Sequence, residues 1–273
     1  MRILRLTSRR NRNIQCLRRL CRRQHREKLG RNLVVLEGQH LVREALRRRI
    51  PVLWAVGDEA YWAKEEGQEL MRQLAGEAPV YVAPPNLLQW ACSTETSPGI
   101  AALARCECCS LADLSDARKV LVLDGVADPG NVGTLCRVAH AAGLDAVVSL
   151  RGTADAYNTK ALRASAGSIL WLKVAQRIPR DVFCRWARSS GLSIWAATAR
   201  GGRPPWALEL FRGGWALVLG HETTGVSEYV LQHSCGKVTV PMPGGVESLN
   251  VAAAGAMILY EWIRQLHGQR GEA

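Results

Sequence analysis

The sequence predicts an α/β protein with a mostly parallel sheet, preceded by a smaller α/β domain. From Lys119 onward, short runs rich in aliphatic and β-branched residues alternate with helical segments, as expected of parallel strands joined by crossover helices. A second strand–helix alternation begins earlier, at Leu33. The chain has 273 residues, 48% of them hydrophobic, so two domains with cores of their own are possible.

We expect the first domain to span residues 1–105. Its strands are predicted from short aliphatic runs, and its helices from apolar residues that recur every three or four positions. The predicted elements are a strand at Leu33–Glu37, a helix at Gln39–Arg49, a strand at Val52–Val56, a helix near Ala60–Leu74 and a strand at Val80–Val82.

The join between the domains is expected within Thr94–Leu114, where the turn sequence TETSPG is followed by CECCS. We place the linker at residues 106–118 and the second domain at 119–273. The strands predicted in the second domain are Val120–Leu123, Ala146–Leu150, Ile194–Thr198, Trp215–Leu219 and Lys237–Val240.

The net charge of +12 is concentrated at the N-terminus. Residues 1–49 hold 16 of the 36 lysines and arginines but only three of the 24 acids, so the rest of the chain is close to neutral. Arginine forks match phosphate oxygens, which favours a nucleic-acid backbone as the partner. The residues expected to contact RNA are Arg9, Arg10, Arg12, Arg18, Arg19, Arg22 and Arg23.

Two other interpretations of this basic segment stay open: a solvated helix face, or an organellar transit segment. The transit segment is disfavoured because Ile14, Leu17, Leu20 and Cys21 form an apolar stripe at helical spacing. A DNA-binding protein would be supported by charge alone.

The composition also bears on the compartment. No apolar run reaches the ~18 residues of a membrane span, so no membrane association is predicted. The nine cysteines are odd in number and irregularly spaced, which favours reduced thiols and a cytoplasmic location. Cys106, Cys108 and Cys109 lack a second ligand pair at suitable spacing, so no metal site is predicted.

Ligands of such sheets bind at the carboxyl ends of the strands, and three loops there are unusual. The first is DGVADPGNVGTLCRVAHAAG, residues 124–143. Asn131 is suited to cap the helix that follows. Arg137 shares a helix face with Gly133 and His140, so its guanidinium is expected to face solvent or a ligand.

The second loop is LGHETTGVSE, residues 219–228. Gly220 permits close approach of a backbone or ligand, and Gly225 permits a turn with positive φ. Glu222 taken alone would more often be a surface carboxylate than a catalytic one.

The third loop, PMPGGVESLN, follows the strand that ends at Val240. Ser248 is the expected N-cap of the next helix, which leaves the Asn250 amide free to meet a ligand. Small residues make this helix suited to close packing. Its predicted stripe consists of Ala252, Ala256, Leu259, Ile263 and Leu266.

Together, DGVADPGNVGTLCRVAHAAG, LVLGHETTGVSE and VPMPGGVESLNVAAAGAMILYE resemble the three ordered motifs of the SpoU (TrmH-type) RNA 2′-O-ribose methyltransferases, a branch of the SPOUT superfamily. The resemblance covers residues 119–265. AYNTKALRASAGS, residues 156–168, is similar to the family segment between motifs one and two. Residues 34–46 and 94–104 more weakly resemble the small RNA-binding domain often found before it.

The resemblance implies a deep C-terminal trefoil knot that binds S-adenosylmethionine, and a homodimer formed through the knot and the C-terminal helix. Knots are rare exceptions among folds. The implied cofactor contacts are Leu219, Gly220, Val240, Met242 and Leu249. The implied catalytic set is Asn131, Arg137, Glu222, Ser248 and Asn250.

The implied reaction is attack of a ribose 2′-hydroxyl on the sulfonium methyl group, without a metal. Arg137 would be either the base or a cation that binds the adjacent phosphate and stabilises the developing alkoxide; its high pKa favours the second role. The two-domain layout favours ribosomal RNA as the substrate. A transfer-RNA enzyme and a non-catalytic RNA-binding protein with the same fold are the alternatives.

Overall fold

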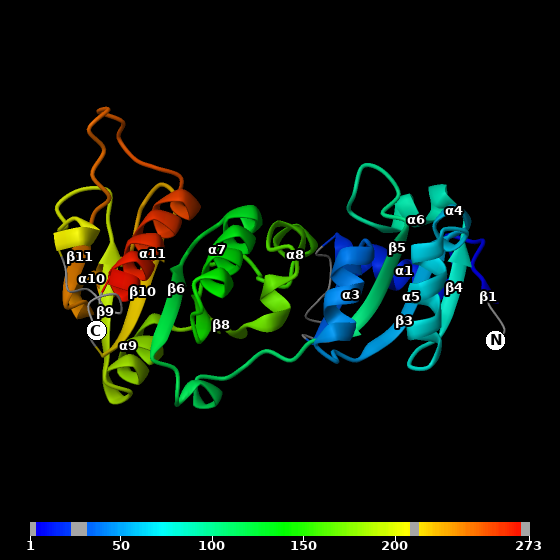
Figure 1. Ribbon diagram of the computed structural model, residues 1–273, viewed down its shortest axis with the longest axis horizontal. Helices are drawn as coiled ribbons and strands as arrows, with labels where there is room; N and C mark the ends of the chain where they lie inside the picture. The colour runs from blue at the N-terminus through cyan, green and yellow to red at the C-terminus, as the bar shows by residue number, and fades with distance from the viewer. Residues whose placement is uncertain (1–3, 23–31, 208–212, 269–273) are drawn as a thin grey trace. The chain divides into compact units, whose positions relative to one another are not determined.

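The computed structural model describes residues 4–22, 32–207 and 213–268 (Figure 1). The chain divides into two compact units. Unit 1 comprises residues 1–107 together with 157–170, and unit 2 comprises residues 108–156 together with 171–273. The segment 157–170 therefore belongs to unit 1, although both its neighbours in sequence belong to unit 2.

Unit 1 is built on a five-stranded mixed sheet with the order β1-β4-β3-β5-β2. β5 is antiparallel to both of its neighbours, whereas β3, β4 and β1 are parallel to one another. The elements of unit 1 are β1 (Leu4–Arg5), α1 (Arg12–Cys21), β2 (Leu33–Glu37), α3 (Gln39–Arg47), β3 (Val52–Asp58), α4 (Glu59–Trp62), α5 (Glu65–Ala75), β4 (Val80–Ala83), α6 (Pro85–Ala91), β5 (Ile100–Arg105) and α8 (Thr159–Ala164).

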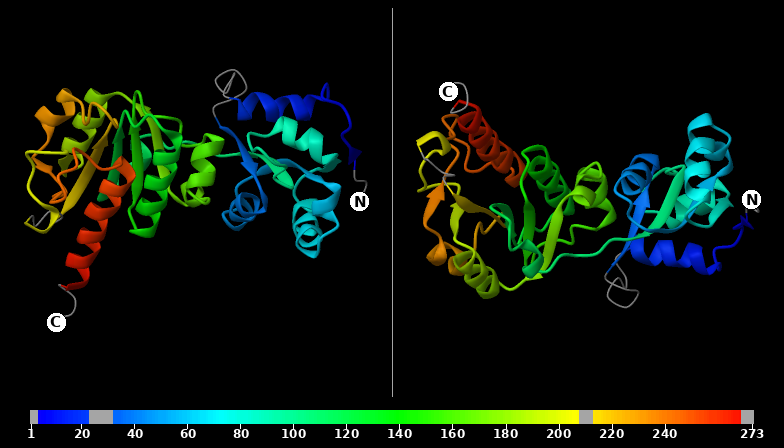
Figure 2. Two further views of the ribbon diagram at one scale, coloured as in Figure 1. Left: turned by 90° about the horizontal axis from the view of Figure 1, so that it is seen from above. Right: turned by 60° about the horizontal axis from the view of Figure 1, so that its bottom comes forward.

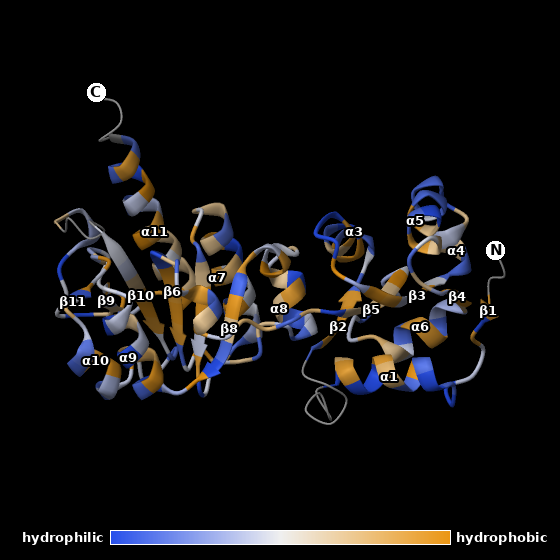
Figure 3. Ribbon diagram, turned by 90° about the horizontal axis from the view of Figure 1, so that it is seen from below, coloured by the Kyte–Doolittle hydropathy of each residue, from blue (hydrophilic) through white to orange (hydrophobic). Residues whose placement is uncertain are grey.

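Helix α1 is part of the core of unit 1. Hydrophilic and hydrophobic residues alternate along it (Figure 3), and the predicted stripe of Ile14, Leu17, Leu20 and Cys21 is buried. Ile14 and Leu17 are fully buried in the same cluster as Leu88 of α6 and Val56 of β3. The basic segment is therefore an amphipathic helix whose polar face carries the arginines.

Two predictions for unit 1 were wrong in detail. Part of the expected join, Ile100–Arg105, is the strand β5. Its first five residues are buried, so the sequence IAALA lacks the alternation that marks a half-exposed strand. The helix expected near Ala60–Leu74 is two helices, α4 and α5. A side chain at Gly67 would lie 2.1 Å from the Tyr61 carbonyl oxygen, so glycine permits the second helix to pack closely on the first.

Unit 2 contains a six-stranded parallel sheet with the order β11-β9-β10-β6-β7-β8. Its elements are η1 (Ala112–Leu114), β6 (Lys119–Asp124), α7 (Pro129–Ala141), β7 (Ala146–Leu150), β8 (Lys173–Ile178), α9 (Arg180–Ser189), β9 (Leu192–Ala197), η3 (Pro205–Ala207), β10 (Gly214–Gly220), α10 (Glu228–His233), β11 (Gly236–Val238) and α11 (Val251–Gly268); a further short helix, η2 (Ser168–Trp171), spans the return from unit 1. The edge strand β8 was not predicted; only two of its six residues are buried, so its apolar run is short.

Helices cover both faces of this sheet, with α7 and α11 side by side on one face and α9 and α10 on the other (Figure 2). Val120 and Val122 of β6 pack in a core cluster with Phe183 of α9 and Val230 of α10. Burial on both faces explains why the central strands are continuous aliphatic runs.

Close packing of α11 depends on a small residue. A Cβ atom at Gly255 would lie 2.6 Å from Leu135 of α7 and 2.7 Å from Leu219 of β10. The predicted stripe on this helix is only partly available to a second subunit, because Ala252 and Leu259 are already buried within the single chain. The exposed apolar side chains of α11 are instead Met257, Tyr260 and Leu266.

Strand β11 is hydrogen-bonded on both edges. On one edge, the Val238 carbonyl accepts a hydrogen bond from Thr198 N at 2.8 Å. On the other, Arg203 N donates to the Lys237 carbonyl, and Thr239 N donates to the Arg203 carbonyl, both at 3.0 Å. The connection between β9 and β10 thus passes along the outer edge of β11, an arrangement that a knot requires; the threading itself stays a prediction. No helix in the described parts of the chain is long and apolar enough to cross a membrane.

Candidate functional site

The candidate site lies at the carboxyl ends of β6, β9, β10 and β11, where the three unusual loops meet. Parallel strands bring their carboxyl ends to one edge of the sheet, so segments about a hundred residues apart in sequence become neighbours. The hydrogen bonds between these loops are made by side chains and by backbone amides at the starts of α7 and α10.

Glu222 joins the second loop to the first. Its carboxylate accepts hydrogen bonds from Ala127 N at 3.0 Å, from Asp128 N at 3.2 Å and from Asn131 Nδ2 at 2.8 Å. Partial burial alone would raise the pKa of Glu222, but these hydrogen bonds together lower it below the ordinary glutamate value. Glu222 is therefore an ionised acceptor that orders the start of α7.

Asn250 extends this connection to the third loop, because its Nδ2 donates to Asn131 Oδ1 at 3.0 Å. The Asn250 Oδ1 atom also accepts from Ala252 N at 2.9 Å and from Ala253 N at 3.3 Å. Glu222, Asn131 and Asn250 thus form one hydrogen-bonded chain across all three loops.

The capping predictions were wrong at both helices. Asp128, and not Asn131, caps α7, since its carboxylate accepts from Gly130 N at 2.6 Å and Asn131 N at 3.1 Å. Asn250, and not Ser248, caps α11. In each case the path of the loop decides which residue caps the helix, and sequence alone does not determine that path. The Asn250 amide is accordingly not free but bonded to Asn131.

A cavity of about 460 Å³ lies beside this chain of hydrogen bonds. Its walls come from the ends of β9 and β10, the loop after β11 and the first turns of α11. All five predicted cofactor contacts line it, namely Leu219, Gly220, Val240, Met242 and Leu249. Glu222 and Ser248 line it as well, whereas Asn131, Arg137 and Asn250 do not.

Arg137 stands apart from the other predicted catalytic residues. It is exposed on α7, and its guanidinium makes no hydrogen bond or ion pair with another residue in the described ranges. Its cation is therefore available to a ligand from solution.

The second loop turns sharply at the cavity wall. His221 and Gly225 exchange backbone hydrogen bonds at 3.0 and 2.9 Å, and Gly225 has a φ of 72°. A Cβ atom at Gly220 would lie 2.1 Å from the Gly225 carbonyl carbon and the Val226 nitrogen. Gly220 is thus required for the backbone itself to fold back here, which agrees with the close approach predicted at this glycine.

Two parts of the site were missed from the sequence. Residues 197–200, after β9, line the cavity, and the carboxyl-end rule applied to that predicted strand would have found them. Asp124 is the other: its buried carboxylate accepts from Arg180 Nε at 2.8 Å and from Ser227 N at 2.9 Å. The signal was available, since an acid directly ends an apolar strand.

The predicted RNA-binding arginines lie in unit 1 and fall into two groups. Arg9, Arg18 and Arg22 line one pocket, together with Trp90. Arg10, Arg12 and Arg19 are exposed and do not line it. Arg23 lies outside the described residues.

We expect Glu222→Gln to loosen the start of α7, because a neutral amide is a weaker acceptor and its NH2 group opposes the N–H donors. Since the pKa of Glu222 is lowered, its carboxylate stabilises the folded loops fully above the ordinary value of about 4.5, and this stabilisation is lost as the pH falls through the lower folded value. Hydrogen exchange should show protection factors of the Ala127 and Asp128 amides lower by roughly tenfold at pH 7, with the difference shrinking below pH ~4.5.

Glu228→Gln on α10 is the matched control, because it removes an exposed carboxylate that bonds only to Gln232 among the described residues. Equal protection of the Ala127 and Asp128 amides in both variants would contradict the ordering role of Glu222.

Comparison with known proteins finds family matches for both parts of the chain. The SpoU rRNA Methylase family matches residues 118–260, and the MRM3-like substrate binding domain matches residues 11–102. A curated relative, 23S rRNA (guanosine(2553)-2′-O)-methyltransferase RlmP from Bacillus subtilis (strain 168), is 34% identical over 251 residues, which are 86% of this chain and 90% of the relative.

Solved structures agree in fold over nearly the whole chain. One titled as an RNA 2′-O ribose methyltransferase has 29% identity and a TM-score of 0.79, covering 96% of this chain and 99% of the other. The AdoMet-bound rRNA methyltransferase from Sinorhizobium meliloti has a TM-score of 0.85 at 23% identity, covering 97% and 98%, and this likeness shows the fold. With a family match over more than half its length and a curated relative aligned over most of both chains, the protein belongs to the SpoU rRNA methylase family.

Proposed function

We propose that the protein transfers a methyl group from S-adenosylmethionine to a ribose 2′-hydroxyl of large-subunit ribosomal RNA. The observation that carries the proposal is the cavity at the carboxyl ends of β9 and β10, closed by the loop after β11 and adjoining the chain of Glu222, Asn131 and Asn250. In this proposal residues 1–105 bind the RNA, residues 106–118 link the domains and residues 119–273 carry the reaction.

The cavity suits the cofactor in size and lining. About 460 Å³ falls within the ~300–1,000 Å³ of small-molecule sites. Leu219, Val240, Met242 and Leu249 offer apolar contact for a purine ring, while Gly220 exposes backbone groups. Arg200 and the carboxylates of Glu222 and Glu247 offer charges of both signs, as a cofactor with a carboxylate, an ammonium and a sulfonium requires.

When bound, S-adenosylmethionine supplies a methyl group on a cationic sulfur that leaves as a neutral thioether. The task of the protein is then to hold the ribose hydroxyl in line and to stabilise the oxygen as its proton passes to solvent. We assign Arg137 to the substrate, since its exposed guanidinium can bind a phosphate beside the reacting ribose. Ser248 and the amides of Asn131 and Asn250 complete the proposed polar set, and Glu222 holds Asn131 in position.

The choice of ribosomal RNA is supported by RlmP, a relative that aligns over nearly its full length and is named for a guanosine of 23S rRNA. The proposed location is the cytoplasm, a compartment that contains ribosomal RNA and keeps cysteine thiols such as these nine reduced.

Mapping of 2′-O-methyl groups in total RNA from cells with and without the protein tests the proposal. One site in large-subunit rRNA should lose its methyl group when the protein is absent and regain it when the protein is restored. A lost site in transfer RNA would instead support the transfer-RNA alternative, and an unchanged map would support the non-catalytic one.

Leu249→Arg should abolish binding of S-adenosylmethionine, because a long cation would fill an apolar part of the cavity. Val246→Arg is the matched control, since Val246 lies in the same loop, is 56% exposed and does not line the cavity. Calorimetry without RNA should detect micromolar binding by the parent and the control only. Undiminished binding by Leu249→Arg would remove this cavity as the cofactor site.

Arg137→Ala should lower the methyl-transfer rate by roughly 10²-fold, because the guanidinium is proposed to stabilise charge in the transition state. Cofactor affinity should be unchanged, because Arg137 does not line the cavity. Arg188→Ala removes an exposed arginine from α9 and serves as the control. Rescue by Arg137→Lys would indicate a purely electrostatic role, whereas continued loss would indicate oriented contact by the planar fork. Single-turnover rates measure this, and a parental rate in Arg137→Ala would contradict the assignment.

We further propose a homodimer formed through α11. Three of its apolar side chains are exposed, with Met257 at 50% and Tyr260 at 68%, and they lie on the outer side of a helix whose inner side is packed on α7. Twofold dimers are the commonest closed assemblies, so one such face can be shared by two copies.

Tyr260→Asp should weaken this dimer by at least ~30-fold, because it places a charge at the centre of a desolvated contact. Tyr229→Asp on α10 changes another exposed tyrosine and is the control. Sedimentation velocity across the micromolar range should give the dimer mass for the parent and control and a monomer mass for Tyr260→Asp. A monomeric parent would contradict the proposal.

A further inference from the structure

Unit 1 contains a second concave site, a pocket of about 680 Å³ with a basic lining. It is formed by the turn before α1, one face of α1, helix α6 and the loop that follows α6. Its lining includes Arg9, Arg18, Arg22, Trp90, Ser93 and Glu95. Three of them are arginines and one is an acid, so the pocket is suited to an anion.

The three arginines line the same pocket, and Arg9 and Arg22 both repel the charge of Arg18. None makes an ion pair with a carboxylate in the described ranges. Arg18 lies in α1, and Arg22, four residues further along, is the C-cap of this helix. Desolvation, followed by repulsion from Arg22 and Arg9, lowers the pKa of Arg18. Like charges at this spacing destabilise a helix, and a bound anion would offset that cost.

Trp90 supplies a stacking surface in the same pocket. The Arg18 guanidinium carbon lies 3.6 Å from the centroid of its ring, and Nη1 of Arg18 donates to the Trp90 carbonyl at 2.6 Å. The Arg9 guanidinium carbon is 5.1 Å from the same centroid. Aromatic rings and arginine planes are the surfaces on which unpaired RNA bases stack.

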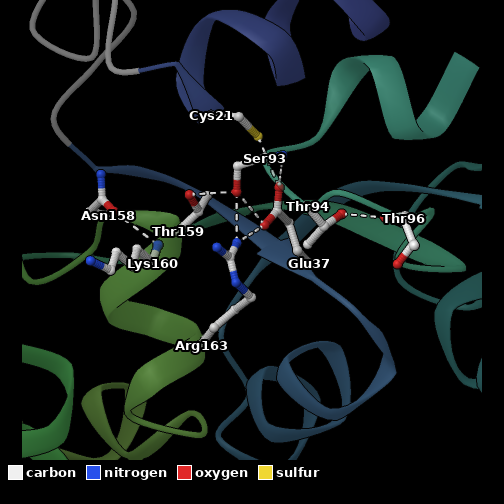
Figure 4. A network of polar contacts seen from close by, with 9 residues as sticks. All are labelled: Cys21, Glu37, Ser93, Thr94, Thr96, Asn158, Thr159, Lys160 and Arg163. Atoms are coloured by element: carbon white, nitrogen blue, oxygen red, sulfur yellow. Dashed lines mark hydrogen bonds and ion pairs between the residues drawn. The ribbon is translucent and has the colours of Figure 1, made fainter. Parts of the chain in front are cut away.

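The floor of the pocket is fixed by a buried carboxylate. Glu37 is only 4% exposed and accepts hydrogen bonds from Ser93 N at 2.5 Å and Ser93 Oγ at 2.7 Å. Arg163 of α8 bonds to both Glu37 and Ser93 Oγ, and Thr159 Oγ1 lies within hydrogen-bonding distance of Ser93 Oγ, at 3.0 Å (Figure 4). Arg163 neutralises Glu37, so this carboxylate does not cancel the charge of the pocket.

We propose that this pocket binds one unpaired nucleotide of RNA, with its phosphate on Arg9 and Arg22 and its base against the Arg18–Trp90 stack. Asn86 and Thr94 also line the pocket, and their polar groups can bond to the edge of a base. This proposal rests on the proposed function in one respect, that RNA is the substrate. It identifies, in addition, the residues of unit 1 that distinguish single strands from duplexes.

Two double variants of the full chain distinguish binding by charge alone from binding in a shaped pocket. Arg9→Ala with Arg22→Ala removes two charges from the pocket, and Arg10→Ala with Arg19→Ala removes two exposed charges outside it. The probe is a fluorescein-labelled single-stranded RNA of about 12 nucleotides, within the range of known single-strand sites. The pocket variant should lose at least tenfold more affinity than the control in fluorescence anisotropy. Equal losses would overturn the pocket.

Substitution of Trp90 tests the stacking half of the proposal. Trp90→Leu should weaken binding of the single strand by roughly 5- to 100-fold, with the salt dependence unchanged because no phosphate contact is removed. The duplex of the same sequence should bind as it does to the parent. Trp90→Phe keeps an aromatic plane and should recover most of the affinity, which separates stacking from a disturbed fold. Parental affinity in Trp90→Leu, or no recovery in Trp90→Phe, would overturn the stacking role.

Inorganic polyphosphate is the competitor that distinguishes a nucleotide from phosphate alone. It should displace the RNA probe much less well at equal phosphate concentration, and equal displacement would overturn the assignment of a base to the pocket. These measurements use neither methyl transfer nor the cofactor. An unchanged 2′-O-methyl map in cells without the protein would therefore contradict the proposed function without altering this result.

Discussion

The arrangement of the site depends on the carboxylate of Glu222. It is the shared acceptor for two backbone amides and one side-chain amide at the start of α7, and through Asn131 it is connected to Asn250 at the start of α11. Amides at the start of a helix have no partner within the helix, and an ionised acceptor is among the strongest partners they can have. One side chain thus sets the relative positions of three loops.

A second carboxylate, which is buried, also connects loops of the site by hydrogen bonds. Asp124, at the end of β6, accepts from Arg180 at the start of α9 and from Ser227 at the start of α10. Glu222 therefore connects the loops to the helices on one face of the sheet, and Asp124 connects them to the helices on the other. Asp124 is buried and fixes the fold around the cavity. Glu222 is near the surface, and the amide groups that it orders lie beside the cavity.

The sequence predicted those features that depend on local pattern. The stripe on α1, the strands β2 and β7 and the close approach at Gly220 each follow from spacing or from a glycine. The caps of α7 and α11 did not, because Asp128, Asn131, Ser248 and Asn250 are all good capping residues and only the path of the loop decides among them. Strand β5 was missed for a related reason: burial by partners remote in sequence, and not an alternating pattern, makes IAALAR a strand.

The position of α1 changes how the basic N-terminus should be understood. In a disordered tail, arginines would gain only from counterion release when RNA binds. Here, Ile14 and Leu17 are fully buried against α6 and the sheet, so folding holds Arg18 and Arg22 on a fixed surface next to Trp90. Their mutual repulsion is then compensated by core burial within unit 1, and the side chains need little further ordering when an anion arrives. It also follows that removal of the basic segment would expose the core around Leu88, so its charge and its packing can be separated only by substitution of the outward-facing arginines.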